Sequence, residues 1–221
     1  MPKETDNIPF TDSFSHWLEQ TRRNLASGGS ADVPCGGCTG CCRAKQFVHI
    51  EADETETLSR IPGRYLFPAP GKPAGTMVMG YDDEGRCPML AGNGCSIYAH
   101  RPRTCRQYDC RVLAAAGVEV EDEDRRPIAE QVARWQIECD SSEDRANLDA
   151  LRSAAGFLHG HPECFESGKP ANETELALHA VKAQPVFVGP AHDVPGSIRG
   201  AEDDVVENVR RTVRDFDSRD E

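Results

Sequence analysis

The sequence predicts an α+β protein, in which a small cysteine-stapled domain of short β-hairpins and helices is extended by a mostly helical C-terminal part. Eight of the ten cysteines fall between positions 35 and 110, in two sets. Beyond residue 117 the apolar residues follow helical spacing between charged ones. We therefore expect an N-terminal arm and helix (1–30), a cysteine-cluster domain (31–116) and a helical module with a mobile tail (117–221).

Composition narrows the class of protein. The chain has 221 residues and a formal net charge of -12, whereas proteins that bind nucleic acid or membrane surfaces usually carry a basic excess. We expect neither partner. No apolar leader follows Met1 and no run is as long as a membrane span, which predicts a cytoplasmic protein. In that reducing compartment, clustered cysteines are metal ligands or redox thiols more often than disulfides.

The N-terminal third contains one clear helix signal and one strand signal. Residues 1–10 are polar with two prolines, and we expect no order there. Thr11 or Asp12 can cap a helix that carries Phe14, Trp17, Leu18 and Leu25 and that ends at Gly28-Gly29. Residues 47–50 predict a strand, and 51–60 a helix ended by Pro62.

The middle of the chain predicts turns that present thiols. Residues 76–81 can pair with 86–89 across the turn 82–85. A second turn, 91–94, has Cys87 and Cys95 on its flanks, as in metal knuckles. Arg101-Pro102 then predicts the start of a helix that runs through Cys105 towards Ala116.

The C-terminal half predicts four helices, at 127–138, 142–158, 172–183 and 202–216. Asn172 with Glu175 forms a capping box for the third. The fourth has an apolar stripe of valines at 205, 206, 209 and 213 on an otherwise charged helix. This half is where we expect a protein partner, if the chain has one.

The cysteine spacing predicts a metal site and leaves two metals open. The first set reads C-x2-C-x2-C-C, which is similar to the run with which ferredoxins ligate a 4Fe–4S cluster, whereas zinc sites usually draw a pair from each of two knuckles. We place the 4Fe–4S cluster ahead of zinc. Cys41 and Cys42 are adjacent, and in an extended segment their side chains would point to opposite sides. Arginines at 101, 103, 106 and 111 would offset anionic thiolates, or simply form a solvated helix face.

Other uses of these residues explain fewer of the clustered cysteines. Cys35 and Cys38 could cycle as a dithiol, but the other six cysteines would then have no role. His49 is expected to be structural. The sequence assigns no role to His159, His161, Cys139 or Cys164.

The two cysteine sets and the residues around them, CPML, GCSIY, RP and CRQYDC, resemble the CxxCxxCC cysteine-cluster family, whose members are described as zinc- or iron-chelating. The resemblance covers about residues 33–112 and implies a metal-chelating domain. Pro88, Tyr98, Arg101 and Pro102 fall on accompanying positions. The implied ligands are Cys35, Cys38, Cys41, Cys42, Cys87, Cys95, Cys105 and Cys110.

Three functions follow from this as alternatives. The first is a metal-chelating protein in which an iron–sulfur cluster or zinc has a structural or redox-sensing role, without substrate chemistry of its own. The second is an enzyme, either an iron–sulfur oxidoreductase or a methylase-like protein-modifying enzyme, since some members of that family are flagellin lysine methylases. No glycine-rich loop for S-adenosylmethionine is visible, nor an evident base or nucleophile. The third is a zinc-stapled adaptor for protein partners.

Overall fold

The computed structural model describes residues 8–10, 13–31, 33, 37–188 and 199–218. The chain forms two compact units that alternate along the sequence. Unit 1 consists of Met1–Gly29, Cys110–Glu119 and Arg134–Glu221, and unit 2 of Ser30–Asp109 and Val120–Ala133.

Unit 1 is mostly helical. Two short strands pair in parallel, Ile8 with Trp135 and Pro9 with Gln136. Its elements are β1 (Ile8–Pro9), α1 (Phe14–Ser27), α5 (Arg111–Ala116), β7 (Trp135–Gln136), α7 (Ser142–Gly160), the 3-10 turn η4 (Pro162–Cys164), α8 (Glu173–Ala183), the 3-10 turn η5 (Gln184–Phe187) and α9 (Arg199–Asp217).

The helix α1 begins and ends at residues with the right capping chemistry. Ser13 Oγ accepts the His16 N–H at 3.3 Å, and Gly28 closes the helix with φ +63°, a conformation that favours glycine. Thr11 and Asp12, the caps expected from the sequence, lie outside the described residues. Phe10, Phe14 and Trp17 form an aromatic cluster that is almost fully buried. The expected lack of order is therefore wrong for residues 8–10.

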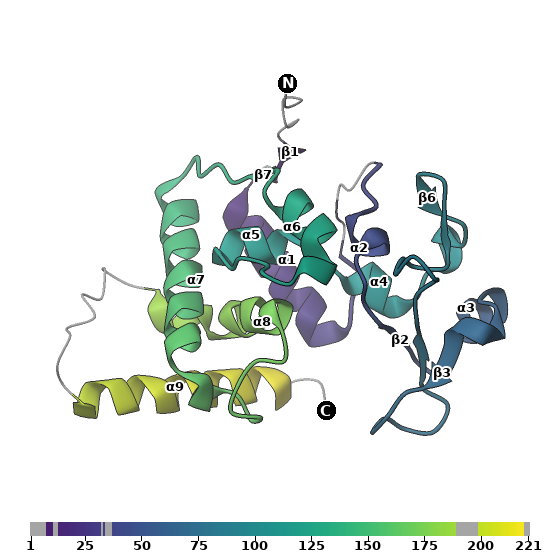
Figure 1. The fold of residues 1–221 in the computed structure, drawn as a ribbon. Coiled ribbons are helices and arrows are strands. Elements are labelled where there is room, and N and C mark those ends of the chain that lie inside the picture. The colour runs from purple at the N-terminus through teal and green to yellow at the C-terminus, as the bar shows by residue number, and fades with distance from the viewer. Residues whose placement is uncertain (1–7, 11–12, 32, 34–36, 189–198, 219–221) are drawn as a thin grey trace. The chain divides into compact units, whose positions relative to one another are not determined.

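In unit 1, helix α8 packs against both α7 and α9 (Figure 1). Asn172 Oδ1 accepts the Glu175 N–H at 3.0 Å, which confirms the N-cap contact of the predicted capping box, while the Glu175 carboxylate accepts the N–H of Ala171, one residue before the N-cap. In α9, Val206, Val209 and Val213 are buried. The valine stripe is therefore the face with which α9 packs.

Unit 2 holds short strands and short helices. A three-stranded sheet has the order β2-β4-β3, and β5 pairs with β6 in a hairpin. Its elements are α2 (Gly40–Arg43), β2 (Val48–Ile50), α3 (Thr55–Arg60), η1 (Gly63–Tyr65), β3 (Leu66–Pro68), β4 (Met77–Met79), β5 (Leu90–Ala91), β6 (Gly94–Cys95), η2 (Tyr98–His100), α4 (Arg103–Gln107), η3 (Glu123–Arg125) and α6 (Arg126–Val132).

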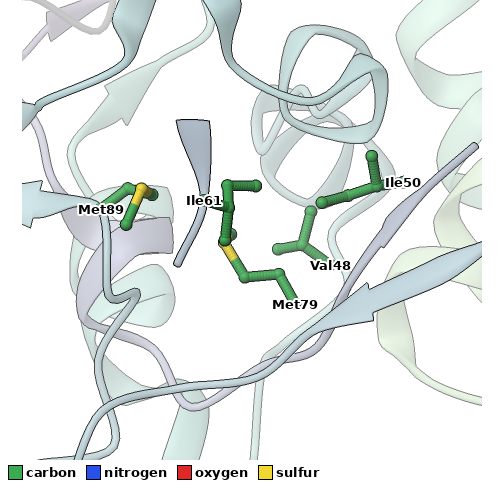
Figure 2. Close-up of a cluster of buried hydrophobic side chains, with 5 residues drawn as sticks. All are labelled: Val48, Ile50, Ile61, Met79 and Met89. Atoms are coloured by element: carbon green, nitrogen blue, oxygen red, sulfur yellow. The ribbon is translucent and has the colours of Figure 1, made fainter. Parts of the chain in front are cut away.

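A small apolar cluster forms the core of unit 2 (Figure 2). It brings together Val48 and Ile50 of β2, Met79 of β4, Ile61 directly after α3 and Met89 directly before β5. Three cysteines, Cys87, Cys95 and Cys105, pack against this cluster. The thiols therefore lie at the edge of the core.

One predicted hairpin is wrong. The sequence suggested that 76–81 pairs with 86–89, but β4 lies between β2 and β3, antiparallel to both. Both hydrogen-bonding edges of β4 are therefore occupied. The predicted turn itself is present, since the Asp82 N–H bonds the Arg86 carbonyl at 2.8 Å.

Two predicted helices are shorter than expected. The helix expected from Arg101 to Ala116 is divided into α4 and α5, because Tyr108 adopts an extended conformation and the two pieces belong to different units. The helix expected at 127–138 ends at Val132, since residues 135–136 form β7 beside β1.

The structure confirms a mixed α+β fold with a helical C-terminal part. The strand at 47–50 and the helices at 142–158, 172–183 and 202–216 are present as β2, α7, α8 and α9. Among the described residues, no helix has the length and apolar character needed to cross a membrane. The domain ranges expected from the sequence, and the stapling by cysteines, remain predictions.

Candidate metal centre

The short helix α2 presents two neighbouring cysteines, Cys41 and Cys42. It packs against α6. A Cβ on Gly40 would come within 2.8 Å of the Pro127 carbonyl oxygen, so only glycine allows this approach. Arg43 Nε donates to Thr39 Oγ1 at 2.8 Å across the same turn. Gly40 thus helps to set the place of both thiols.

Cys87 is joined to α2 through its backbone. Its N–H donates to the Cys42 carbonyl oxygen at 2.8 Å. The loop before it is fixed by the Asp82 carboxylate, which accepts the N–H groups of Glu84 and Arg86 at 3.0 and 2.9 Å. The bond from the Arg86 N–H also holds the pKa of Asp82 below its usual range.

Cys95 and Cys105 come from separate elements. Cys95 lies on β6 opposite Leu90, where the Ser96 N–H bonds the Met89 carbonyl at 2.9 Å. Cys105 lies on α4, which contacts β2. Thr104 Oγ1 donates to the His49 carbonyl at 2.7 Å and so ties α4 to that strand.

Four of these cysteines line one small cavity of about 80 Å³, namely Cys41, Cys42, Cys87 and Cys105. The rest of the wall is mainly apolar. Its other lining residues include Ala44, Phe47, Val48, Met79 and Tyr108. A cavity with several sulfurs and few other polar groups suits a soft metal ion.

Interactions between the thiols shift their pKa values in opposite directions. The Cys42 thiol lowers the pKa of Cys41 to about 7 through a side-chain hydrogen bond, and it lowers the pKa of Cys87 to about 7 in the same way. The same two bonds raise the pKa of Cys42 itself. The three thiols therefore interact with one another, and a metal ion that replaces their protons would be bound by the same three sulfurs.

Burial acts on the other two cysteines. It raises the pKa of Cys105 to about 12, and it also raises the pKa of Cys95. Both lie against the apolar cluster of Figure 2, where the charged thiolate loses hydration. An unpaired thiolate is costly there, whereas a metal-bound one is compensated.

The arginines of the second cysteine set have different partners. Arg101 lowers the pKa of Cys95 and Cys105, although burial outweighs it. Arg103 pairs with Asp53 at 2.7 Å, and Arg106 lies 3.8 Å from Glu54. Arg111 is buried in unit 1, where it donates to the Phe10 carbonyl at 3.3 Å. Of the four arginines expected to offset the thiolate charge, Arg101 acts on the cysteines in this way.

Among the described residues, three predicted ligands do not line this cavity, namely Cys38, Cys95 and Cys110. Cys35 falls outside the described residues. Cys38 precedes α2, and its Sγ accepts the Gly40 N–H at 3.3 Å. Cys110 belongs to unit 1, where it is buried and accepts the Trp135 Nε1–H at 3.3 Å. The eight-cysteine ligand set stays a prediction.

Cys41 and Cys42 do not lie in an extended segment, for which opposite side-chain directions were expected. Both residues lie on a helix, where their thiols hydrogen-bond to one another. Within the part of the chain that the structure describes, no three His, Cys, Asp or Glu side chains are already arranged around a metal position. Four cysteines line one cavity, and ligation of one ion would require their sulfurs to come closer together.

The residues without an assigned role lie apart from this site in the sequence and belong to unit 1. His161 is held between two carboxylates, with Nδ1 at 3.0 Å from Glu163 and Nε2 at 3.3 Å from Glu202. Its ring stacks on Phe157. Cys164 is buried, which raises its pKa. His161 therefore fastens η4 to α9. His49 is exposed on β2, and its expected structural role stays a prediction.

Sequence reasoning missed the residues that shape the site without ligating. Gly40, between two cysteines, was treated as a spacer, although its close approach to Pro127 is a long-range contact that no local pattern shows. Phe47 lines the cavity although its side chain is 60% exposed, and its ring contacts Tyr81 at 5.3 Å. In the sequence, the role of Phe47 is marked only by the aromatic pair that it forms with Tyr81, one residue before β2 and the other after β4.

Comparison with known proteins agrees with this picture. Residues 34–126 match the model of the CxxCxxCC family, described as "Putative zinc- or iron-chelating domain". No curated protein and no solved structure matches the chain.

Proposed function

Because residues 34–126 carry a CxxCxxCC domain, we propose that this protein chelates one metal ion through Cys41, Cys42, Cys87 and Cys105. The observation that carries the proposal is that these four cysteines line the same small cavity. Four thiolates form a complete ligand set for a structural zinc ion.

The contacts between the sulfurs favour a single ion over a cluster. In a tetrahedral site with zinc–sulfur bonds of about 2.3 Å, neighbouring sulfurs lie about 3.8 Å apart. The Cys42 thiol lies close enough to those of Cys41 and Cys87 to shift their pKa values, which suits ligation of one shared ion. In a 4Fe–4S cluster each thiolate binds a different iron, which spreads the sulfurs further. Zinc is therefore the first candidate.

A 4Fe–4S cluster is the second candidate, and Cys38 favours it. The C-x2-C-x2-C run places Cys38 just ahead of α2, and its Sγ accepts the Gly40 N–H at 3.3 Å. Bonds of that kind to sulfur tune the potential of iron–sulfur clusters. A redox-sensing role would belong to this candidate.

The role that we propose for zinc is structural. Cys87 and Cys105 pack against the small apolar cluster of unit 2, so a bound ion would join α2, α4 and the loop of Cys87 to that core. In zinc-finger peptides such binding contributes on the order of 10 kcal/mol to folding. The proposal includes a cytoplasmic location, because clustered cysteines in a reducing compartment are metal ligands more often than disulfides.

Metal and sulfide analysis tests the proposal. The full chain is purified under anaerobic conditions, and zinc, iron and acid-labile sulfide are measured together with the visible spectrum. We expect about one zinc per chain, no sulfide and no colour, as for a four-thiolate site. Iron with sulfide and a brown colour would establish the second candidate. A chain that takes up neither metal, even on reconstitution, contradicts the proposal.

A further inference from the structure

We infer that Glu54 is a positioning residue for the metal centre, because its buried carboxylate holds the start of α4 and so sets the place of Cys105. The inference rests on the proposed function, which assigns Cys105 as a ligand.

The Glu54 side chain is only 5% exposed and bridges two segments far apart in the sequence. Its Oε1 accepts the Glu51 N–H at 3.0 Å. Its Oε2 accepts the Arg103 N–H at 2.6 Å, and the Arg106 guanidinium lies 3.8 Å away. A buried carboxylate is stable only with such partners.

The contact with Arg103 fixes α4 at its first helical residue. Arg103 opens α4, and its N–H is one of the groups that the helix itself cannot satisfy. Cys105 follows two residues later, about 3 Å further along the helix axis at 1.5 Å per residue. A shift of Arg103 relative to Glu54 would therefore move the Cys105 sulfur relative to the cavity.

Neighbouring contacts on α4 are of a different kind. Thr104 donates a neutral hydrogen bond to the His49 carbonyl at 2.7 Å. The Arg103 side chain pairs with Asp53 at 2.7 Å, where the Asp53 side chain is largely exposed and the Arg103 side chain is partly exposed. Exposed pairs contribute little to stability. Asp53, one residue before Glu54 and also bound to Arg103, thus provides a matched control.

The test compares the full-length wild type with Glu54→Gln, Asp53→Asn, Cys105→Ser and the double variant Glu54→Gln/Cys105→Ser. Glutamine keeps the shape but places an amide NH₂ against one of two backbone N–H donors. Zinc affinity is measured by competition with a chromophoric chelator. Cobalt(II) is the spectroscopic probe, because its thiolate charge-transfer absorbance counts bound sulfurs.

We expect Glu54→Gln to weaken zinc binding by about 10- to 100-fold and to lose the cobalt absorbance of one thiolate. Asp53→Asn stays within about twofold of wild type. On the Cys105→Ser background, Glu54→Gln changes the affinity by no more than about twofold, because the two residues act through one sulfur.

Two results would overturn the inference: wild-type affinity and spectrum in Glu54→Gln, or an equal loss in both backgrounds. Wild-type protein that binds neither zinc nor cobalt would overturn the proposed function as well. If Glu54→Gln does not fold, amide exchange in the wild type decides. Zinc must then slow exchange of the Arg103 N–H by about tenfold or more, and unchanged exchange contradicts the positioning role.

Discussion

Cys42 interacts with two other cysteines of the candidate site, since its thiol lowers the pKa of both Cys41 and Cys87. Its carbonyl also accepts the Cys87 N–H. Loss of this sulfur removes the thiol that interacts with the two others, whereas the backbone contact can remain.

We predict that Cys42→Ser loses bound zinc, with an apparent affinity lower by at least about 100-fold, since a structural site needs all four ligands. Zinc content per purified chain and chelator competition measure this. Cys139→Ser is the matched control, because Cys139 lies in unit 1 and outside both cysteine sets. Full zinc occupancy in Cys42→Ser would contradict the four-ligand assignment.

At the scale of residues, the sequence predicted where the thiols are but not how they meet. Spacing singled out eight cysteines, among them Cys41, Cys42, Cys87 and Cys105, because so many cysteines so close together are unusual, but it left open which four share one centre. It could not show that Cys41 and Cys42 hydrogen-bond to one another, which depends on a four-residue helix. Nor could it single out Glu54, whose partner Arg103 is 49 positions away.

Among the elements, α1 and α7 are joined by one carboxylate. Asp144, in the first turn of α7, accepts the Ser15 N–H of α1 at 2.7 Å. Ser15, through its hydroxyl and this N–H, holds the pKa of Asp144 below its usual range. The carboxylate thereby serves the N-terminus of a helix other than its own.

We predict that Asp144→Ala lowers the free energy of unfolding by about 1 kcal/mol at pH 7, as for other lost helix caps. Because the pKa of Asp144 is lower in the folded state, its contribution is complete above the unfolded pKa of about 4 and is lost as pH falls through the folded value. Urea unfolding at pH 7 and pH 3 measures the difference, which should shrink at the lower pH.

The neighbouring carboxylate provides the control for this prediction. Glu143 lies in the same first turn but is exposed, so Glu143→Ala should change the free energy of unfolding by less than about 0.5 kcal/mol. A difference between wild type and Asp144→Ala that does not depend on pH would contradict the proposed role of the charge.

Elements with local signals could be predicted, and those set by distant partners could not. The α8 N-cap contact and the α9 valine stripe are readable within one segment, and both are present. The partners of β4 are residues 48–50 and 66–68, and β7 depends on residues 8–9. Such short strands have too few residues to specify pairing by pattern.

For the whole molecule, the proposal predicts that metal removal affects the two units unequally. Unit 2 has a small apolar cluster with cysteines packed on it. Unit 1 has a core formed by buried apolar side chains from several helices. The helices of unit 1 could be predicted from the sequence, because a long amphipathic segment shows its helical periodicity without reference to distant partners.

We predict that a strong chelator increases amide exchange in residues 37–109 and 120–133 by at least about tenfold, while α7 and α8 keep their protection. Hydrogen exchange with mass spectrometry follows both regions in one sample. Restoration by zinc, and not by magnesium, is the control, because thiolates select soft ions. Equal deprotection of both units would contradict a metal role confined to unit 2.

The alternation of the units along the chain limits how the metal-binding part can be transplanted. The matched segment 34–126 includes α5, whose Val112 and Leu113 are buried among the helices of unit 1. Excision of that segment as a cassette would expose these two side chains to water and would leave a gap in the donor. It would also omit residues 127–133, among them the Pro127 carbonyl against which Gly40 lies. Fusion or truncation variants of this chain should therefore keep residues 8–218 together.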